Sequence, residues 1–235
     1  MGRRTVTSDR TPFDPKPGPR GPAQDRSLPA GARRRLTAIL AAEVVGYANL
    51  VAQDREGTHA VLRELRRDPI NPLLAEYQAR LVALMEDRCI AEFRSVDDAV
   101  GCAVAVQKAV AAAQGRVPAE RRIVFRAGVD LGDVQADGDD DLRGDAVNVA
   151  AGLQRICAPG EVMISSAARG QLRLKPDAPV EFAGERALEG LGRPIRAYRV
   201  RAGGAAGQGH RWPWLQRWRL AAGSRPAKRD AGRRR

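Results

Sequence analysis

The feature that most constrains the fold of this chain is a regular change of hydrophobic period across residues 34–201. Short apolar runs, typical of buried strands, alternate with longer segments whose apolar residues recur at helical spacing. The expected order is a strand, a helix, a hairpin, a helix, a second hairpin, a helix and trailing strands. This order predicts an α+β domain in which helices pack on a mostly antiparallel sheet.

The first half of this region contains a strand, a helix and a hairpin. Residues 34–47 (RRLTAILAAEVVGY) predict the strand, and residues 81–93 predict the hairpin. Between them, helical spacing begins at Gly57 and is interrupted by Pro69 and Pro72, because proline disrupts a helix interior.

The second half begins with a capping box at residues 95–98, which predicts the start of a helix. Residues 122–138 predict two strands that meet at Gly132-Asp133, where Asp133 is interpreted as a turn residue rather than a ligand. The remaining elements are expected as a helix over 145–156, a strand and short helix in 160–168, and a strand pair in 180–188 and 193–200.

The net charge of +12 lies in the two ends of the chain. Residues 1–35 hold nine Arg and Lys against three Asp, and residues 202–235 hold nine against one, which leaves −2 for the region between them. Residues 1–33 and 202–235 are predicted to be disordered basic tails that flank one domain over 34–201. The C-terminal tail carries tryptophans among arginines, which is typical either of a solvated, disordered end or of a segment that contacts an anionic membrane or nucleic acid, and the solvated end is preferred.

Cysteine usage and hydropathy argue against several classes of protein. The three cysteines have no metal-ligand spacing, which indicates buried reduced thiols in a cytoplasmic protein. No apolar run approaches the roughly 20 residues of a membrane span, and the N-terminus lacks the apolar core of a signal peptide.

Two carboxylates stand where strands end. Glu43 lies near the end of the first strand, and Asp87 lies on the hairpin tip between Glu86 and Arg88. If the first strand neighbours the hairpin, both carboxylates converge at one end of the sheet. Hard oxygen ligands there would suit Mg²⁺ and a nucleoside triphosphate.

Several segments together resemble the catalytic domain of class III adenylate and guanylate cyclases. They are RRLTAILAAEVVGYANLV, LMEDRCIAEFRSVDDAVGCAVAVQ, RAGVDLGDV, DDLRGDAVNVAAGLQRICAPGEVMIS and RPIRAYRV, in this order. The resemblance implies a ferredoxin-like core that works as a head-to-tail dimer, either a homodimer or a heterodimer with another cyclase chain. It also implies composite sites that use two Mg²⁺ or Mn²⁺ ions to convert ATP to cAMP and pyrophosphate in intracellular signalling.

Residue by residue, the resemblance assigns the metal positions to Glu43 and Asp87, with Glu43 in place of the usual Asp. Asp141 matches the base-recognising Asp, and Asn148 matches the transition-state Asn. By composition alone, Asp141 could equally be a solvated charge in an acidic loop, and Asn148 an exposed helix residue.

Three positions depart from the family pattern. Ala83 replaces the base-recognising Lys, Gly152 the transition-state Arg, and Glu189 a Lys that contacts the triphosphate. Glu86 and Arg88 replace glycines that flank Asp87, and they are interpreted as relaxed constraint. Glycine inside a helix costs about 1 kcal/mol, so Gly152 is interpreted as a turn where nothing demands a side chain.

Two functions therefore remain open. One is a weak cyclase, a phosphorus-oxygen lyase that is poor or inactive as a homodimer. The other is a non-catalytic pseudo-cyclase that acts as a dimerisation or nucleotide-binding regulatory module.

Overall fold

The computed structural model of the 235-residue chain describes residues 33–137, 141–173 and 179–201. The predicted tails lie outside these residues, apart from Arg33, so their proposed lipid or nucleic-acid contacts stay a prediction. The strands are β1 (Arg33–Val44), β2 (Arg80–Leu84), β3 (Arg88–Phe93), β4 (Phe125–Asp137), β5 (Asp141–Arg143), β6 (Glu161–Ser165), β7 (Val180–Arg186) and β8 (Ile195–Arg201). The α-helices are α1 (Tyr47–Gln53), α2 (Arg55–Leu65), α3 (Asn71–Glu76), α4 (Val96–Ala113), α5 (Asp145–Ile156) and α6 (Ser166–Gln171).

The strands form one sheet in the order β2-β3-β1-β4-β6-β8-β7, with β5 paired to β4. All of its pairs in the described residues are antiparallel except β4 with β6. β3 lies between β1 and β2, and β1 lies between β3 and β4. Helices connect β1 to β2 and β3 to β4, and each of these pairs has one strand inserted between its members, which makes two split β-α-β units. Two such units form the ferredoxin-like arrangement, so the predicted α+β fold is confirmed.

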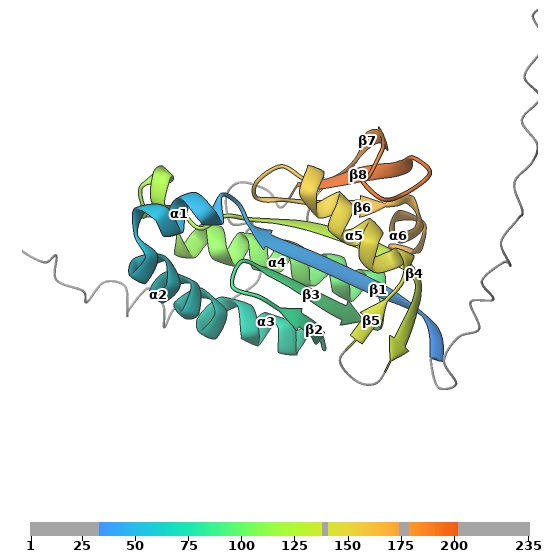
Figure 1. Ribbon diagram of the computed structural model, residues 1–235, viewed down its shortest axis with the longest axis horizontal. Coiled ribbons are helices and arrows are strands. Elements are labelled where there is room, and N and C mark those ends of the chain that lie inside the picture. The colour runs from blue at the N-terminus through green and yellow to red at the C-terminus, as the bar shows by residue number, and fades with distance from the viewer. Residues whose placement is uncertain (1–32, 138–140, 174–178, 202–235) are drawn as a thin grey trace, which may run out of the picture. The chain divides into compact units, whose positions relative to one another are not determined.

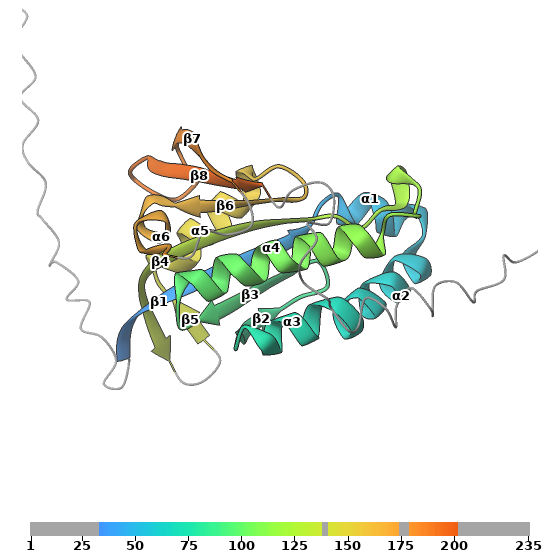
Figure 2. The ribbon, with the colours of Figure 1, turned by 180° about the vertical axis from the view of Figure 1, so that it is seen from behind.

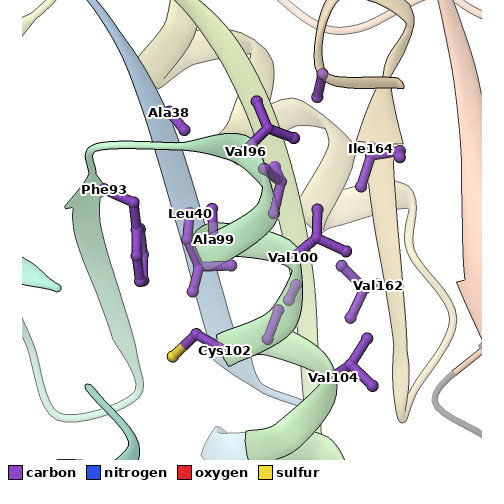
Figure 3. Packing of buried hydrophobic residues seen from close by; sticks show 14 of the residues in the cluster. Ala38, Leu40, Phe93, Val96, Ala99, Val100, Cys102, Val104, Val162 and Ile164 are labelled. Carbon is purple, nitrogen blue, oxygen red and sulfur yellow. The ribbon is translucent and has the colours of Figure 1, made fainter. Parts of the chain in front are cut away.

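Helices cover both faces of the sheet (Figures 1 and 2). α4 packs on one face, where Val100 and its neighbours meet Leu40 of β1, Phe93 of β3 and Val162 of β6 (Figure 3). α5 packs on the opposite face against β1 and β4. The predicted start of α4 is confirmed, because the backbone N–H of Asp98 donates to Ser95 Oγ at 3.0 Å.

The prediction of two strands that meet at Gly132-Asp133 is wrong. β4 runs unbroken from Phe125 to Asp137, and Gly132 and Asp133 pair with Thr37 and Leu36 of β1. A Cβ at Gly132 would lie 3.1 Å from Ala146 Cβ of α5. The glycine therefore serves close helix packing, and Asp133 is an exposed strand residue rather than a turn residue.

The helical region before the hairpin starts earlier than predicted and is not broken at its prolines. α1 begins at Tyr47, and a π-helical segment over Arg66–Ile70 joins α2 to α3. Pro69 lies inside that segment, and Pro72 lies in the first turn of α3. Proline lacks the N–H that a regular helix interior needs, and the wider π turn accommodates this loss.

Two of the three cysteines are buried, as predicted. All three are free, with Cys102 and Cys157 buried and Cys89 partly buried. Burial raises the pKa of Cys89 and Cys157 to about 11 and that of Cys102 to about 12. These thiols therefore stay protonated and unreactive near neutral pH.

Asp130, in the middle of β4, is a buried carboxyl. Its Oδ1 accepts a hydrogen bond from Ser165 Oγ, and Ser165 in turn caps α6. Burial raises the pKa of Asp130 to about 6, although the Ser165 hydrogen bond acts in the opposite direction. Ionised Asp130 is therefore a cost to the fold near neutral pH.

Asp130→Asn should remove this cost. The folded pKa of about 6 lies above the unfolded value of about 3.9, so wild-type stability falls as pH rises through that window. The gain in unfolding free energy of the variant over wild type should be larger at pH 8 than at pH 4, by on the order of 1–3 kcal/mol. Urea unfolding at both pH values measures it, with exposed Asp133→Asn as the control. An equal gain at both pH values would contradict the assignment.

Candidate active site

Glu43 and Asp87 lie at the same end of the sheet. Glu43 is the penultimate residue of β1 and pairs with Arg88 of β3. The backbone N–H of Val44 donates to the carbonyl oxygen of Asp87 at 2.7 Å. The structure therefore brings the two predicted metal positions onto neighbouring segments.

The hairpin tip that carries Asp87 is anchored to the helices beside it. Arg66 Nη2 donates to the carbonyl oxygens of Met85 and Glu86 at 2.7 and 2.6 Å. The Tyr47 hydroxyl donates to Glu86 Oε2 at 2.8 Å and lies 3.0 Å from His59 Nε2. Burial, followed by the hydrogen bond to Glu86, raises the pKa of Tyr47, which keeps the hydroxyl protonated as a donor.

The charges that flank Asp87 therefore have partners. Glu86 accepts from Tyr47, and Arg88 contacts both carboxylate oxygens of Asp87 at 3.4 Å. Sequence reasoning interpreted Glu86 and Arg88 as relaxed constraint, but the structure gives Glu86 an anchoring contact. No local pattern pointed to this, because Tyr47 is far away in the chain.

The Glu43 carboxylate is engaged on both oxygens. Arg126 Nη2 donates to Oε1 at 3.3 Å, and Gln154 Nε2 donates to Oε2 at 2.5 Å. Arg126 is the cross-strand partner of Glu43 in β4, and Gln154 lies on α5. Arg126 and Gln154 were not singled out from the sequence, since neither stands in a recognisable motif.

The donor set at this end of the sheet suits a divalent cation in its chemistry. Mg²⁺ is commonly held by one or two carboxylates together with substrate phosphates, and Glu43 and Asp87 supply two. Within the described residues, no cluster of three or more His, Cys, Asp or Glu could hold a metal ion. Further ligands would therefore have to come from a nucleotide or from water, and a cation at Glu43 would meet the positive charge of Arg126.

The residues assigned to base recognition and the transition state lie elsewhere. Ala83 is half-buried in β2, beside a register shift against β3. Asp141 begins β5, where its backbone pairs with Asp137 of β4. Asn148 is exposed on α5, six residues before Gln154. At 100° per residue the two lie on different faces of the helix, so Asn148 does not face Glu43 of its own chain.

Gly152 has a packing role that the sequence did not reveal. It is buried, and an added Cβ would lie 3.0–3.3 Å from side-chain atoms of Leu188, in the connection between β7 and β8. Glycine is therefore found here because Leu188 leaves no space for a side chain, and not because the helical turn has no need of one. Glu189, which follows Leu188 in the chain, is 90% exposed and contacts Arg155 at 3.7 Å. This surface ion pair contributes little to stability.

Within the described ranges, none of the helices has the length and apolar character needed to cross a membrane.

Known proteins place this fold in one family. No protein-family model matches the chain. It is 39% identical over 166 residues to "Putative adenylate cyclase 3" of Rhizobium meliloti (strain 1021), a match that covers 71% of this chain but only 28% of that relative. The chain thus spans little more than a quarter of this curated relative.

Solved structures give matches over nearly their whole length. The adenylate/guanylate cyclase/hydrolase from Silicibacter pomeroyi is 32% identical, with a TM-score of 0.67, over 72% of this chain and 98% of that one. The adenylyl cyclase CyaB from P. aeruginosa shares the fold at 17% identity, with a TM-score of 0.63, over 75% of this chain and 97% of that one. The chain therefore belongs to the class III adenylate/guanylate cyclase family.

Proposed function

We propose that this chain supplies the metal half of a composite nucleotide-cyclising site and that its reaction is the conversion of ATP to cAMP and pyrophosphate. The observation that carries the proposal is the convergence of Glu43 and Asp87 at one sheet end within a cyclase fold. Class III cyclases depend in general on divalent metal ions, and Mg²⁺ or Mn²⁺ matches these carboxylates. We place the activity in the cytoplasm, where nucleoside triphosphates are available.

The chain's own residues would act mainly by positioning. Glu43 and Asp87 would hold the cations, which when bound neutralise charge on the triphosphate. Arg66 and Tyr47 fix the backbone and the Glu86 side chain of the tip, so that Asp87 is presented on an anchored loop. Asn148 and Asp141 would contact the nucleotide in the second site of a dimer, because exposed Asn148 faces away from Glu43 of its own chain.

The base and transition-state half is expected to be weak. Loss of an arginine that stabilises the transition state costs on the order of 10³–10⁵ in rate in related phosphoryl transfers. Here Gly152 stands at that position under Leu188, Ala83 offers no cation to the base, and Glu189 adds negative charge near a polyanionic substrate. A homodimer, which needs both halves from this chain, is therefore proposed to be a poor catalyst.

The second candidate function is a non-catalytic module that dimerises with another cyclase chain or binds a nucleotide for regulation. Two observations favour it: the Glu43 carboxylate is neutralised by Arg126, and the side chain of Leu188 fills the space beside Gly152.

A cyclase assay on the purified full chain separates these functions. With Mn²⁺ or Mg²⁺ and ATP or GTP, we expect slow formation of cyclic nucleotide. Asp87→Asn should lower it by at least about 10²-fold, because a displaced or lost ligand misplaces the substrate. Asp133→Asn, an exposed aspartate elsewhere on the sheet, is the matched control and should leave the rate unchanged. Product that stays at background with every metal and nucleotide would favour the regulatory module instead.

A further inference from the structure

We propose that Arg126 is a built-in cation that competes with the divalent metal for Glu43 and thereby sets the metal affinity of this chain. The inference rests on the proposed metal role of Glu43 and Asp87. It concerns the two described residues, Arg126 and Gln154, that hold the Glu43 carboxylate in the structure.

The guanidinium of Arg126 has an acceptor at each of its two terminal nitrogens, whereas its buried Nε has no hydrogen-bond partner among the described residues. Nη2 contacts Glu43 Oε1 at 3.3 Å, and Nη1 donates to the carbonyl oxygen of Arg155 at 2.8 Å. Arg155 is the penultimate residue of α5, and the carbonyls at a helix C-terminus attract positive charge. A carboxylate and a helix end therefore hold the same guanidinium from two sides.

Partial burial strengthens this contact. The side chains of Arg126 and Glu43 are 26% and 20% exposed, so water screens the pair less than it screens a surface ion pair. Gln154, which is 6% exposed, donates to the second Glu43 oxygen and completes the coordination of the carboxylate by protein donors. A metal ion at Glu43 must therefore displace Arg126 or share the carboxylate with a positive charge.

The two metal positions differ in this respect. Asp87 contacts Arg88, its neighbour in sequence, at 3.4 Å, and the Arg88 side chain is 51% exposed, about twice as much as that of Arg126. An exposed arginine can swing away at little cost, whereas Arg126 is held at its two terminal nitrogens, Nη1 and Nη2. We infer that a divalent ion engages Asp87 readily and that the Glu43 contact is the step that Arg126 opposes.

Mn²⁺ binding to the full chain, measured by electron paramagnetic resonance, tests the inference without any need for turnover. Arg126→Gln should bind Mn²⁺ about tenfold more tightly than wild type, because it removes the competing charge and keeps a hydrogen-bonding group. Arg199→Gln is the matched control and should equal wild type. Arg199 pairs with Glu161 at 2.9 Å on the same sheet, and the two side chains are 31% and 21% exposed. The control substitution therefore removes a comparable ion pair away from Glu43.

Further variants make each outcome decisive. Adding Glu43→Gln to Arg126→Gln should abolish the gain in Mn²⁺ affinity, and a gain that persists in the double variant would overturn the inference. A folded Arg126→Gln protein that binds Mn²⁺ with wild-type affinity would also overturn it. If Arg126→Gln does not fold, Arg126→Lys replaces it. Lysine keeps the charge but cannot bridge both acceptors, so affinity should rise about threefold, and an unchanged value is again contrary.

Asp87→Asn separates this inference from the proposed function. If Asp87→Asn binds Mn²⁺ more weakly than wild type, but Arg126→Gln binds it no more tightly than wild type, the proposed metal site is supported and the proposed role of Arg126 is wrong. If neither substitution changes Mn²⁺ binding, the metal site itself fails, and the role of Arg126 fails with it.

Discussion

Gly128→Ala is expected to lower the free energy of unfolding by about 3 kcal/mol, at the upper end of the usual cost of overpacking a core. Gly128 lies on β4 where α5 crosses it. An added Cβ would collide with the carbonyl oxygen of Ala150 and lie 2.5 Å from the backbone nitrogen of Gln154. Both atoms belong to the helix backbone, so no side-chain rotation can relieve the contact, and α5 must shift as a whole.

Urea unfolding of both proteins measures this loss. Gly170→Ala is the matched control, because Gly170 lies in α6 with nothing within 4 Å of an added Cβ. Alanine there should be neutral or slightly stabilising through its higher helix propensity. If Gly128→Ala is as stable as Gly170→Ala, the close approach of α5 to β4 is not as tight as described. The variant also bears on function, because a shift of α5 moves Gln154 away from Glu43.

Mixed dimers with an intact cyclase chain are expected to keep partial activity, although this chain alone is proposed to be a poor catalyst. In a composite site the metal half comes from one chain and the base and transition-state half from the other. In the proposed assignment, this chain keeps Glu43 and Asp87 in the metal half but has Ala83 and Gly152 in the opposite half. One of the two sites in a mixed dimer should therefore work weakly, and the other should be dead.

Removal of the partner's own metal ligands isolates the first of these sites. Asp87→Ala in this chain should then lower the remaining rate by at least about 10²-fold. The same substitution at exposed Asp133 should leave it unchanged. Cyclic nucleotide that still forms after Asp87→Ala, or chains that do not form mixed dimers, would disprove the asymmetric arrangement. Arginine at position 152 is not expected to rescue the second site by itself, because Leu188 occupies the space beside Gly152.

Local patterns in the sequence were sufficient for most elements of the fold. The helix expected over residues 145–156 is α5, with the same bounds, and the cap at Ser95 begins α4. Both signals depend on residues within a few positions of each other, since helical period and capping are local properties. The order of the elements and the family resemblance predicted that β1 lies beside the hairpin. That adjacency places Glu43 and Asp87 at the same end of the sheet.

The tertiary structure alone decided what the glycines and the site charges do. The Leu-Gly-Asp pattern predicts a turn at Gly132, but in the structure the absence of a side chain there lets α5 pack closely on β4. The partners of Glu43 are Arg126 and Gln154, more than 80 residues away, and the cover of Gly152 is Leu188. Such contacts leave no local period, because they arise only where the packed sheet and helices bring distant segments together. The sequence by itself therefore determined the fold and the family. The raised pKa of Asp130, the lack of space for a side chain at Gly152 and the contact of Arg126 with Glu43 depend on burial and distance, which only the packing of the tertiary structure sets.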